Sequence, residues 1–432
     1  NVDVILKEDA QSLTEVVVTA LGVQRESKKL GYSVTAVNTD QLTQNRTTNV
    51  MESLEGRVAG LNITPPAAGA GSSMQIRLRG QAAFAGANNA PLIVINGLPI
   101  DQGARGVNGL GTPRDLGDNL SNVNPDDIES MTVLKGATAA AIYGARAANG
   151  AIIITTKSGR KNQGIGVEYS SNYSTQHALN FFDFQTEYGQ GTGGKRPTSG
   201  ANAATTGHFA WGERLDGAPT PIFDGTLQPY SANPDNLFGF LQTGTDFTNT
   251  IAMSGGGANG SFRASFSNTD AEGITPNNEY NRKIANVGIN HNISKKLKLQ
   301  LNINYTNEQQ VNPPQIGTQG PGAVNFFTRL ATSIPLSALK NSAVAANGTE
   351  TLTSGFQGTL LNPYYALAVG QRYETERNRF LSTATLRYDL TDWLYVQGRY
   401  NYDFALSFTE SHDPGGIGTS VPTNADGTFK GA

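Results

Sequence analysis

NVNPDDIESMTVLKGATAAAIYGARAANGAIIITTK, residues Asn122–Lys157, is the stretch that decides the fold of this chain. Its two apolar runs, Glu129–Lys135 and Ala151–Lys157, predict buried strands. The run Ala137–Tyr143 between them predicts a short helix of small residues, and Ala145–Gly150 predicts a tight loop. Because such small residues let a helix, a loop and a strand pack closely, we expect the centre of a compact α+β domain.

Two segments before this stretch extend the same domain. Pro91–Ile100 (PLIVINGLPI) predicts a β-hairpin, because Asn96 and Gly97 suit a type I′ turn between two apolar runs. Thr48–Gly56 (TNVMESLEG) predicts a short helix, since it combines a capping residue, an acidic first turn and a glycine stop. We therefore expect one α+β domain that ends near residue 160.

From about residue 164 the pattern changes to long strands with a period of two. Leu297–Tyr305 places apolar side chains on one face of a strand and Lys, Gln and Asn side chains on the other. Ser261–Ser267 does the same, with Phe262 and Phe266 opposite Arg263. About seven strands are predicted, at roughly 165–175, 247–256, 260–269, 283–293, 296–308, 376–389 and 393–408.

The connections between these strands alternate in length. The short turns are Gly255–Gly260, Ile293–Lys296 and Leu390–Trp393, and the long loops are His177–Asp246, Ala271–Asn281 and Gln310–Thr375. Short turns at one end and long loops at the other are typical of an outer-membrane barrel. A β-sandwich is the alternative, but it has no physical reason for this alternation. Since an open sheet leaves unpaired edge amides in lipid, we expect an incomplete transmembrane antiparallel β-barrel.

The composition excludes several classes of site. The chain has no cysteine, which rules out disulfides, thiolate metal sites and cysteine nucleophiles. A net charge of −3 gives no footprint for nucleic acid. No run approaches the roughly 18–20 apolar residues of a membrane-spanning helix. Asn1–Lys7 has no signal-peptide pattern, so we expect any secretion signal to have been removed.

Taken in order, these motifs resemble the N-terminal part of SusC-like TonB-dependent outer-membrane transporters. The match runs from Leu13 to Lys157 through LTEVVVTALG, LEGRVAGLNI, IRLRGQ, PLIVINGLPI and the opening stretch. The sequence departs from the family in its hairpin turn, where Asn96-Gly97 replaces Asp-Gly, and in its length, which is less than half that of a member. The implied domains are the tail of an N-terminal extension (1–12), a TonB box segment (13–22), a plug (23–160) and the first part of the barrel (161–432).

The resemblance implies a plug seated inside a barrel of about 22 strands. The implied function is active import of a large nutrient across the outer membrane of a Gram-negative cell, with an oligosaccharide as the first expectation and an oligopeptide as the second. The implied partners are TonB of the TonB–ExbB–ExbD system, a SusD-like surface lipoprotein that forms a lid, and outer-membrane lipid. The alternatives are a siderophore or cobalamin receptor, a truncated barrel held in an envelope assembly or secretion complex, and an extracellular β-sandwich binding module.

Two sets of site residues follow from the resemblance. The TonB box would consist of Glu15, Val16, Val17, Val18, Thr19 and Ala20. This segment is short and rich in β-branched residues, which suits backbone pairing with the edge of a partner sheet. Arg77 and Arg79 are expected to project from one face of a strand and to lock the plug to acidic residues of the barrel wall. An ordinary plug strand and a solvated strand face are the respective alternatives.

No catalytic set is predicted, and we expect the protein not to be an enzyme. Gly189–Arg196 approaches a P-loop, but Arg196 stands where a hydroxyl would bind Mg²⁺ and no strand–helix context surrounds it. The four histidines are too scattered for a metal site. We expect no cofactor, with structural calcium in the turns Asp413–Gly416 and Asn424–Gly427 as the alternative.

Overall fold

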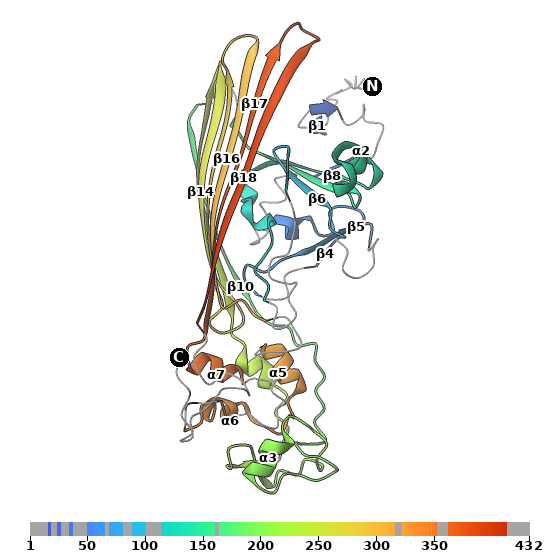
Figure 1. Cartoon of the computed structure of the whole chain (residues 1–432), viewed down its shortest axis with the longest axis vertical. Coiled ribbons are helices and arrows are strands. Elements are labelled where there is room, and N and C mark those ends of the chain that lie inside the picture. Colours follow the sequence, from blue (N-terminus) through green and yellow to red (C-terminus); the bar gives the residue numbers. More distant parts are fainter. Residues whose placement is uncertain are drawn as a thin grey trace, which may run out of the picture.

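The computed structural model describes residues 16–18, 24–26, 34–37, 50–64, 69–80, 89–100, 114–159, 164–315, 322–346, 348, 350–351 and 362–412. Figure 1 shows three parts: a tall curved sheet, a small α+β domain beside one face of that sheet, and a layer of short helices at one end. None of the helices in these ranges is long and apolar enough to cross a membrane. We refer to the three parts as the wall, the plug and the loop layer.

The plug is built around a five-stranded mixed sheet. Its strand order is β3-β8-β9-β6-β7, and β6 and β9 are the parallel pair. These strands are β3 (Val34–Val37), β6 (Leu92–Ile95), β7 (Leu98–Ile100), β8 (Ile128–Leu134) and β9 (Ala151–Thr156). The smaller elements are the strand pairs β1 (Val16–Val18) with β2 (Gln24–Glu26) and β4 (Leu61–Thr64) with β5 (Gln75–Leu78), the helix α2 (Ala137–Tyr143), and the 3₁₀ turns η3 (Val50–Leu54), η4 (Leu120–Asn122), η5 (Pro125–Asp127) and η6 (Gly144–Ala147).

β6 and most of β8 and β9 are apolar and buried because both faces of the sheet are covered there, whereas β8 begins with the exposed Glu129. One face contributes Ile93, Met131 and Ile152 to the main plug core. The other face packs against α2 and η6. The predicted strand–helix–strand unit is therefore confirmed. The hairpin is confirmed as well, since Asn96 and Gly97 have φ values of 50° and 84°, as a type I′ turn requires.

The wall is a seven-stranded antiparallel sheet. Its order is β10-β13-β14-β15-β16-β17-β18, so each strand pairs with the next long strand in the chain. The strands are β10 (Gly166–Gln176), β13 (Gly244–Gly257), β14 (Gly260–Glu272), β15 (Glu279–Asn292), β16 (Leu297–Val311), β17 (Arg372–Asp389) and β18 (Tyr395–His412). All seven predicted strands are present at nearly the predicted bounds. The described sheet is open, and a barrel of about 22 strands stays a prediction.

The two faces of the wall have opposite polarity. In β14, Arg263 and Ser267 are 5% and 3% exposed and face the plug, whereas Phe266 is 47% exposed on the outer face. Ile251 of β13 and Tyr305 of β16 are likewise exposed on that outer face, at 52% and 43%. The predicted alternation is confirmed, and the polar side chains are the buried ones.

The long loops are more ordered than their sequences predict. They contain the strands β11 (Pro219–Pro221) and β12 (Leu227–Pro229) and the helices α3 (Gly200–Thr206), α4 (Asn236–Phe240), α5 (Ala323–Arg329), α6 (Leu336–Asn341) and α7 (Pro363–Ala368). Phe223, Phe240, Phe326 and Leu339 belong to a separate apolar core at this end of the wall. The two long connections, between β10 and β13 and between β16 and β17, are therefore one packed layer.

Candidate functional site

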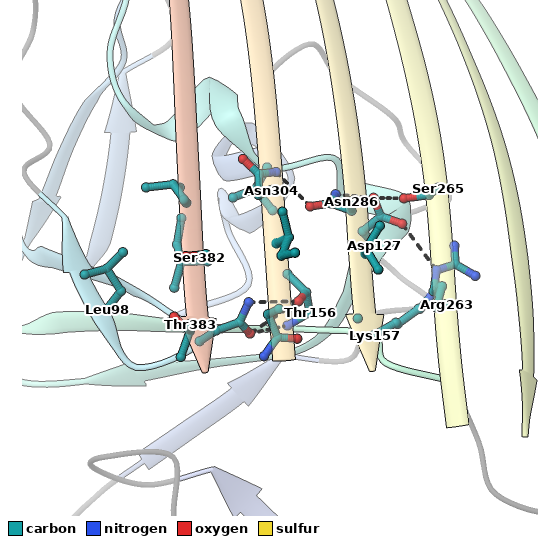
Figure 2. A pocket seen from close by; sticks show the side chains of 18 residues that line it. Leu98, Asp127, Thr156, Lys157, Arg263, Ser265, Asn286, Asn304, Ser382 and Thr383 are labelled. Atoms are coloured by element: carbon teal, nitrogen blue, oxygen red, sulfur yellow. Dashed lines mark hydrogen bonds and ion pairs between the residues drawn. The ribbon is translucent and has the colours of Figure 1, made fainter. Parts of the chain in front are cut away.

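The plug meets the inner face of the wall through several segments, among them residues 114–127 and 156–158. Figure 2 shows Asp127, Thr156 and Lys157 of the plug opposite polar side chains of β14 to β17. The space left between them has a volume of about 20 Å³, which is close to what one water molecule needs. At this place the plug fills the concavity of the wall.

Asp127 is the centre of this contact. It is 2% exposed and ends the turn η5, whose first residues are held by the side chain of Asn124 accepting the N–H of Asp126. Three donors surround its carboxylate: Arg263 Nε at 3.3 Å, Ser265 Oγ at 2.6 Å and Asn286 Nδ2 at 2.5 Å. A buried carboxylate is tolerated only with such a set of partners.

Arg263 joins the plug to two strands of the wall. Its Nη1 lies 2.9 Å from Glu168 of β10, which is 66% exposed, and its Nη2 donates to the carbonyl of Asp126 at 3.3 Å. The planar guanidinium can hold these acceptors and Asp127 at once because its five donors diverge. The Arg263 side chain is thereby fixed from both sides of the interface.

A second cluster surrounds Glu308 of β16. Glu308 pairs with Arg377 of β17 at 3.3 Å and accepts the hydroxyl of Ser121 at 2.5 Å. Arg377 also donates to Asn119 Oδ1 at 2.6 Å, and Arg282 donates to the carbonyl of Ser121 at 2.8 Å. Here the plug contributes neutral groups, and both charges of the ion pair belong to the wall.

The predicted TonB box is only partly within the described residues. Val16, Val17 and Val18 form β1, which pairs antiparallel with Gln24–Glu26. Glu15, Thr19 and Ala20 lie outside the described residues. The strand form agrees with an extended segment, and the TonB-binding role stays a prediction.

The predicted locking arginines differ in their settings. Arg77 lies in β5 and donates to Gln75 of the same strand at 3.0 Å. The strand ends at Leu78, and Arg79 is an exposed residue with a φ of 65°. Arg79 therefore lies past the end of β5, and the expectation that both side chains project from one face stays a prediction. Their locking role stays a prediction.

The polar network of the interface was not predicted from the sequence. Its members on the wall, Arg263, Arg282, Glu308 and Arg377, are charged residues that fall on the buried side of the strand alternation. This inward position could have indicated the network, since a charge on the buried face of a strand needs a partner. The described residues contain no group of three His, Asp or Glu side chains that could hold a metal, and both calcium candidates lie outside them.

A family model and two relatives with similar sequences all point to the TonB-dependent receptors. Residues 26–151 match the model of the TonB-dependent Receptor Plug Domain. The chain is 34% identical over 306 residues to the TonB-dependent receptor SusC of Bacteroides thetaiotaomicron, covering 71% of this chain and 27% of that protein. It is 28% identical over 418 residues to the TonB-dependent receptor P26 of Formosa agariphila, covering 96% of this chain and 38% of that one.

The fold is also found in solved structures. The RagAB peptide importer in its 'open-open' state superposes with a TM-score of 0.62 at 20% identity, over 92% of this chain and 43% of that chain. The 'closed-closed' state of RagAB gives a TM-score of 0.60. The chain thus spans between a quarter and two fifths of the length of the relatives that it matches in sequence.

Proposed function

This chain belongs to the SusC-like TonB-dependent receptors, and from that premise we propose that it supplies the plug and the first wall strands of an outer-membrane nutrient importer. The whole receptor closes the wall into a barrel of about 22 strands around the plug. It takes up a large nutrient from outside the cell and releases it into the periplasm with energy delivered through TonB.

The observation that supports this proposal most directly is the polarity of the wall, which is apolar on its exposed face and polar on its buried face, the reverse of a soluble sheet. Its outer face exposes large apolar side chains, including Ile251, Met253 and Leu386 at 52%, 43% and 47%. Exposed apolar area costs roughly 25 cal/mol per Å² in water, so a soluble sheet would bury this face. In a barrel this face contacts lipid, and the polar inner face contacts the plug.

The N-terminal segment provides the coupling to TonB. Within the described residues, β1 pairs with the three residues of β2, which is a short pairing for a partner strand to replace. Force applied at Val16–Val18 is transmitted along the chain into the plug. Movement of the plug away from the polar face of the wall opens the passage.

The substrate that we propose is an oligosaccharide, with an oligopeptide as the second choice, and a SusD-like lipoprotein covers the outer mouth. The resemblance to SusC-like transporters implies the first choice and the lid, and the second choice is supported by the similar fold of the RagAB peptide importer. In this arrangement the loop layer faces the cell exterior, and the short turns face the periplasm.

The experiment is a proline substitution in the box of the whole receptor. Val17→Pro removes one backbone donor and should abolish nutrient-dependent growth, while the receptor still reaches the outer membrane in normal amounts. Val17→Ala keeps the donor and should retain most of the uptake. Normal growth of the proline variant, with the receptor present, would contradict the proposal.

A further inference from the structure

The loop layer contains a wide groove that the plug and the wall do not form. It has a volume of about 1450 Å³ and lies between residues 183–188 and 208–212 on one side and the end of α5 with residues 328–332 on the other. Sites for small molecules are commonly about 300–1,000 Å³, so this groove has room for an oligomer.

Two aromatic side chains of the groove are open to solvent. Trp211 is 73% exposed and Tyr188 is 43% exposed. Large aromatic side chains bury apolar area when they can, and those left exposed in a concave site are frequent anchors for a ligand. The groove therefore offers flat apolar surfaces.

The backbone beneath these rings is held rigidly. Trp211 donates its N–H to Gly191 at 3.1 Å and accepts the N–H of Gly194 at 2.9 Å. The side chain of Gln185 accepts the N–H groups of Glu187 and Tyr188 at 3.0 and 2.9 Å. A fixed backbone under an exposed ring lowers the entropy that a ligand must remove on binding.

Polar groups of both kinds border the rings. Asp183 and Glu187 are exposed carboxylates that can accept hydrogen bonds, although Glu187 also lies 3.4 Å from Arg214. Arg329 at the end of α5 is an exposed donor, and the hydroxyl of Thr328, which donates to the carbonyl of Val324 at 2.7 Å, can accept. A pyranose has an apolar C–H face and a rim of hydroxyl groups that both donate and accept. The aromatic rings of the groove can contact the apolar face of the sugar, and the neighbouring donors and acceptors can bind its hydroxyl groups.

An extended peptide fits the same groove less well. Peptides are commonly held by a free strand edge, through backbone hydrogen bonds. On this side of the groove the backbone is already paired. The N–H of Gly191 donates to the carbonyl of Phe209 at 2.9 Å, that of Gly212 to Gly189 at 3.1 Å and that of Leu215 to Glu187 at 2.9 Å. Recognition is left to side chains, which favours a sugar.

We propose that this groove is an oligosaccharide-binding subsite in which Trp211 and Tyr188 stack on successive sugar rings. The inference rests on the proposed import function and places an initial contact for the nutrient in the loop layer. Loss of a stacking ring commonly removes about 0.5–1.5 kcal/mol of interaction, so each aromatic contributes up to about tenfold in affinity.

The test measures binding to the whole purified receptor by calorimetry. The probes are maltoheptaose, a laminarin oligomer, a fructan oligomer and a decapeptide mixture. Trp211→Ala should lower the affinity for one oligosaccharide about tenfold, and Trp211→Phe should lose less because it keeps a ring. Phe181→Ala is the matched control, since Phe181 is 85% exposed in the same layer but does not line the groove.

Three results would overturn the subsite: equal affinity of Trp211→Ala and the unsubstituted receptor, a loss confined to the decapeptides, or resistance of Trp211 to N-bromosuccinimide because another part of the receptor covers it. Each result leaves the import proposal intact if Val17→Pro still abolishes uptake. Uptake that survives Val17→Pro contradicts the import function and leaves the binding comparison valid.

Discussion

Single residues determine how the plug is held. Asp127 brings a negative charge to the wall, where Arg263, Ser265 and Asn286 donate to it. At the second cluster the ion pair Glu308–Arg377 lies wholly within the wall, so displacement of the plug there breaks hydrogen bonds to neutral groups. Charge pairing across the interface therefore depends strongly on Asp127.

Asp127→Ala should loosen the plug. Removing one partner of a buried ion pair costs about 3–5 kcal/mol, and we expect the lower end because Arg263 keeps Glu168. The measurement is hydrogen exchange of the β8 and β9 amides in the whole receptor. Glu168→Gln is the control: Glu168 is 66% exposed, so its loss should cost less than about 1 kcal/mol. Equal effects of the two changes would argue against a special role of Asp127.

Contacts between single residues of the plug and the wall are the part of the structure least predictable from the sequence. Strand alternation predicts that Arg263 lies opposite Phe262 and Phe266, but it does not say which face is covered or by what. The NPDD run containing Asp127 gives no sign of a buried charge, because a carboxylate in a turn is usually solvated. Pairings between residues more than a hundred positions apart have no local signal.

Elements were predicted well where their patterns are local. The wall strands follow a period of two, and the short turns between them set the pairing of neighbours. The α2 helix and the two strands around it follow from composition and small residues. The loop-layer helices were missed because each is only five to seven residues long and their apolar residues lie far apart in the chain.

Gly150 shows how tightly the plug elements pack. A Cβ at this position would lie 2.4 Å from Leu78 Cδ2 and 2.9 Å from the carbonyl oxygen of Leu134, and the residue has a φ of 101°. Gly150→Ala should therefore destabilise the plug by about 2–4 kcal/mol through strain and overpacking. Gly144→Ala is the control, because Gly144 also has a positive φ but nothing lies within 4 Å of its added Cβ.

The Gly150→Ala and Gly144→Ala variants are compared by the protease resistance of the plug in the whole receptor under increasing denaturant. Gly144→Ala should shift the transition less than Gly150→Ala, by the backbone strain alone, which is about 1–3 kcal/mol at its φ of 73° and ψ of −163°. If both variants unfold at the same denaturant concentration, close packing at Gly150 does not contribute, and only the backbone conformation matters.

At the scale of the whole molecule, the described residues form three buried apolar cores, and the contact between plug and wall is mainly polar, with Leu381 of β17 joining the main plug core. Two cores lie on the faces of the plug sheet, and the third lies in the loop layer. The plug rests on the wall mainly through hydrogen bonds and ion pairs. Polar contacts can be exchanged for water more readily than apolar ones, so this arrangement suits the plug movement that we propose.

The loop layer should respond to pH on its own. Burial raises the pKa of Glu350 to about 7, although the backbone N–H of Asn362 donates to its carboxylate. A raised folded-state pKa means that stability is fully present below about pH 4.5 and is lost as the pH rises toward about 7. The loss is at most about 3 kcal/mol.

Glu350→Gln removes the titrating group and should flatten this profile. The measurement is the protection of the α6 and α7 amides between about pH 4 and pH 8, corrected for intrinsic exchange. Asp224→Asn is a comparison in the same layer, because hydrogen bonds from Ser342 and Thr226 help to lower the pKa of Asp224 rather than raise it. A profile unchanged by Glu350→Gln would show that another group controls the layer.

The separate core of the loop layer has a consequence for how such receptors diversify. Because Phe223, Phe240, Phe326 and Leu339 belong to a core of their own, we expect mutations there to leave the hydrogen-bond register of the wall strands unchanged. Related receptors could therefore change the loop layer during evolution while the wall and the plug stay the same. We expect chimeras that exchange these two connections as a unit to assemble, and those that exchange either alone to fail.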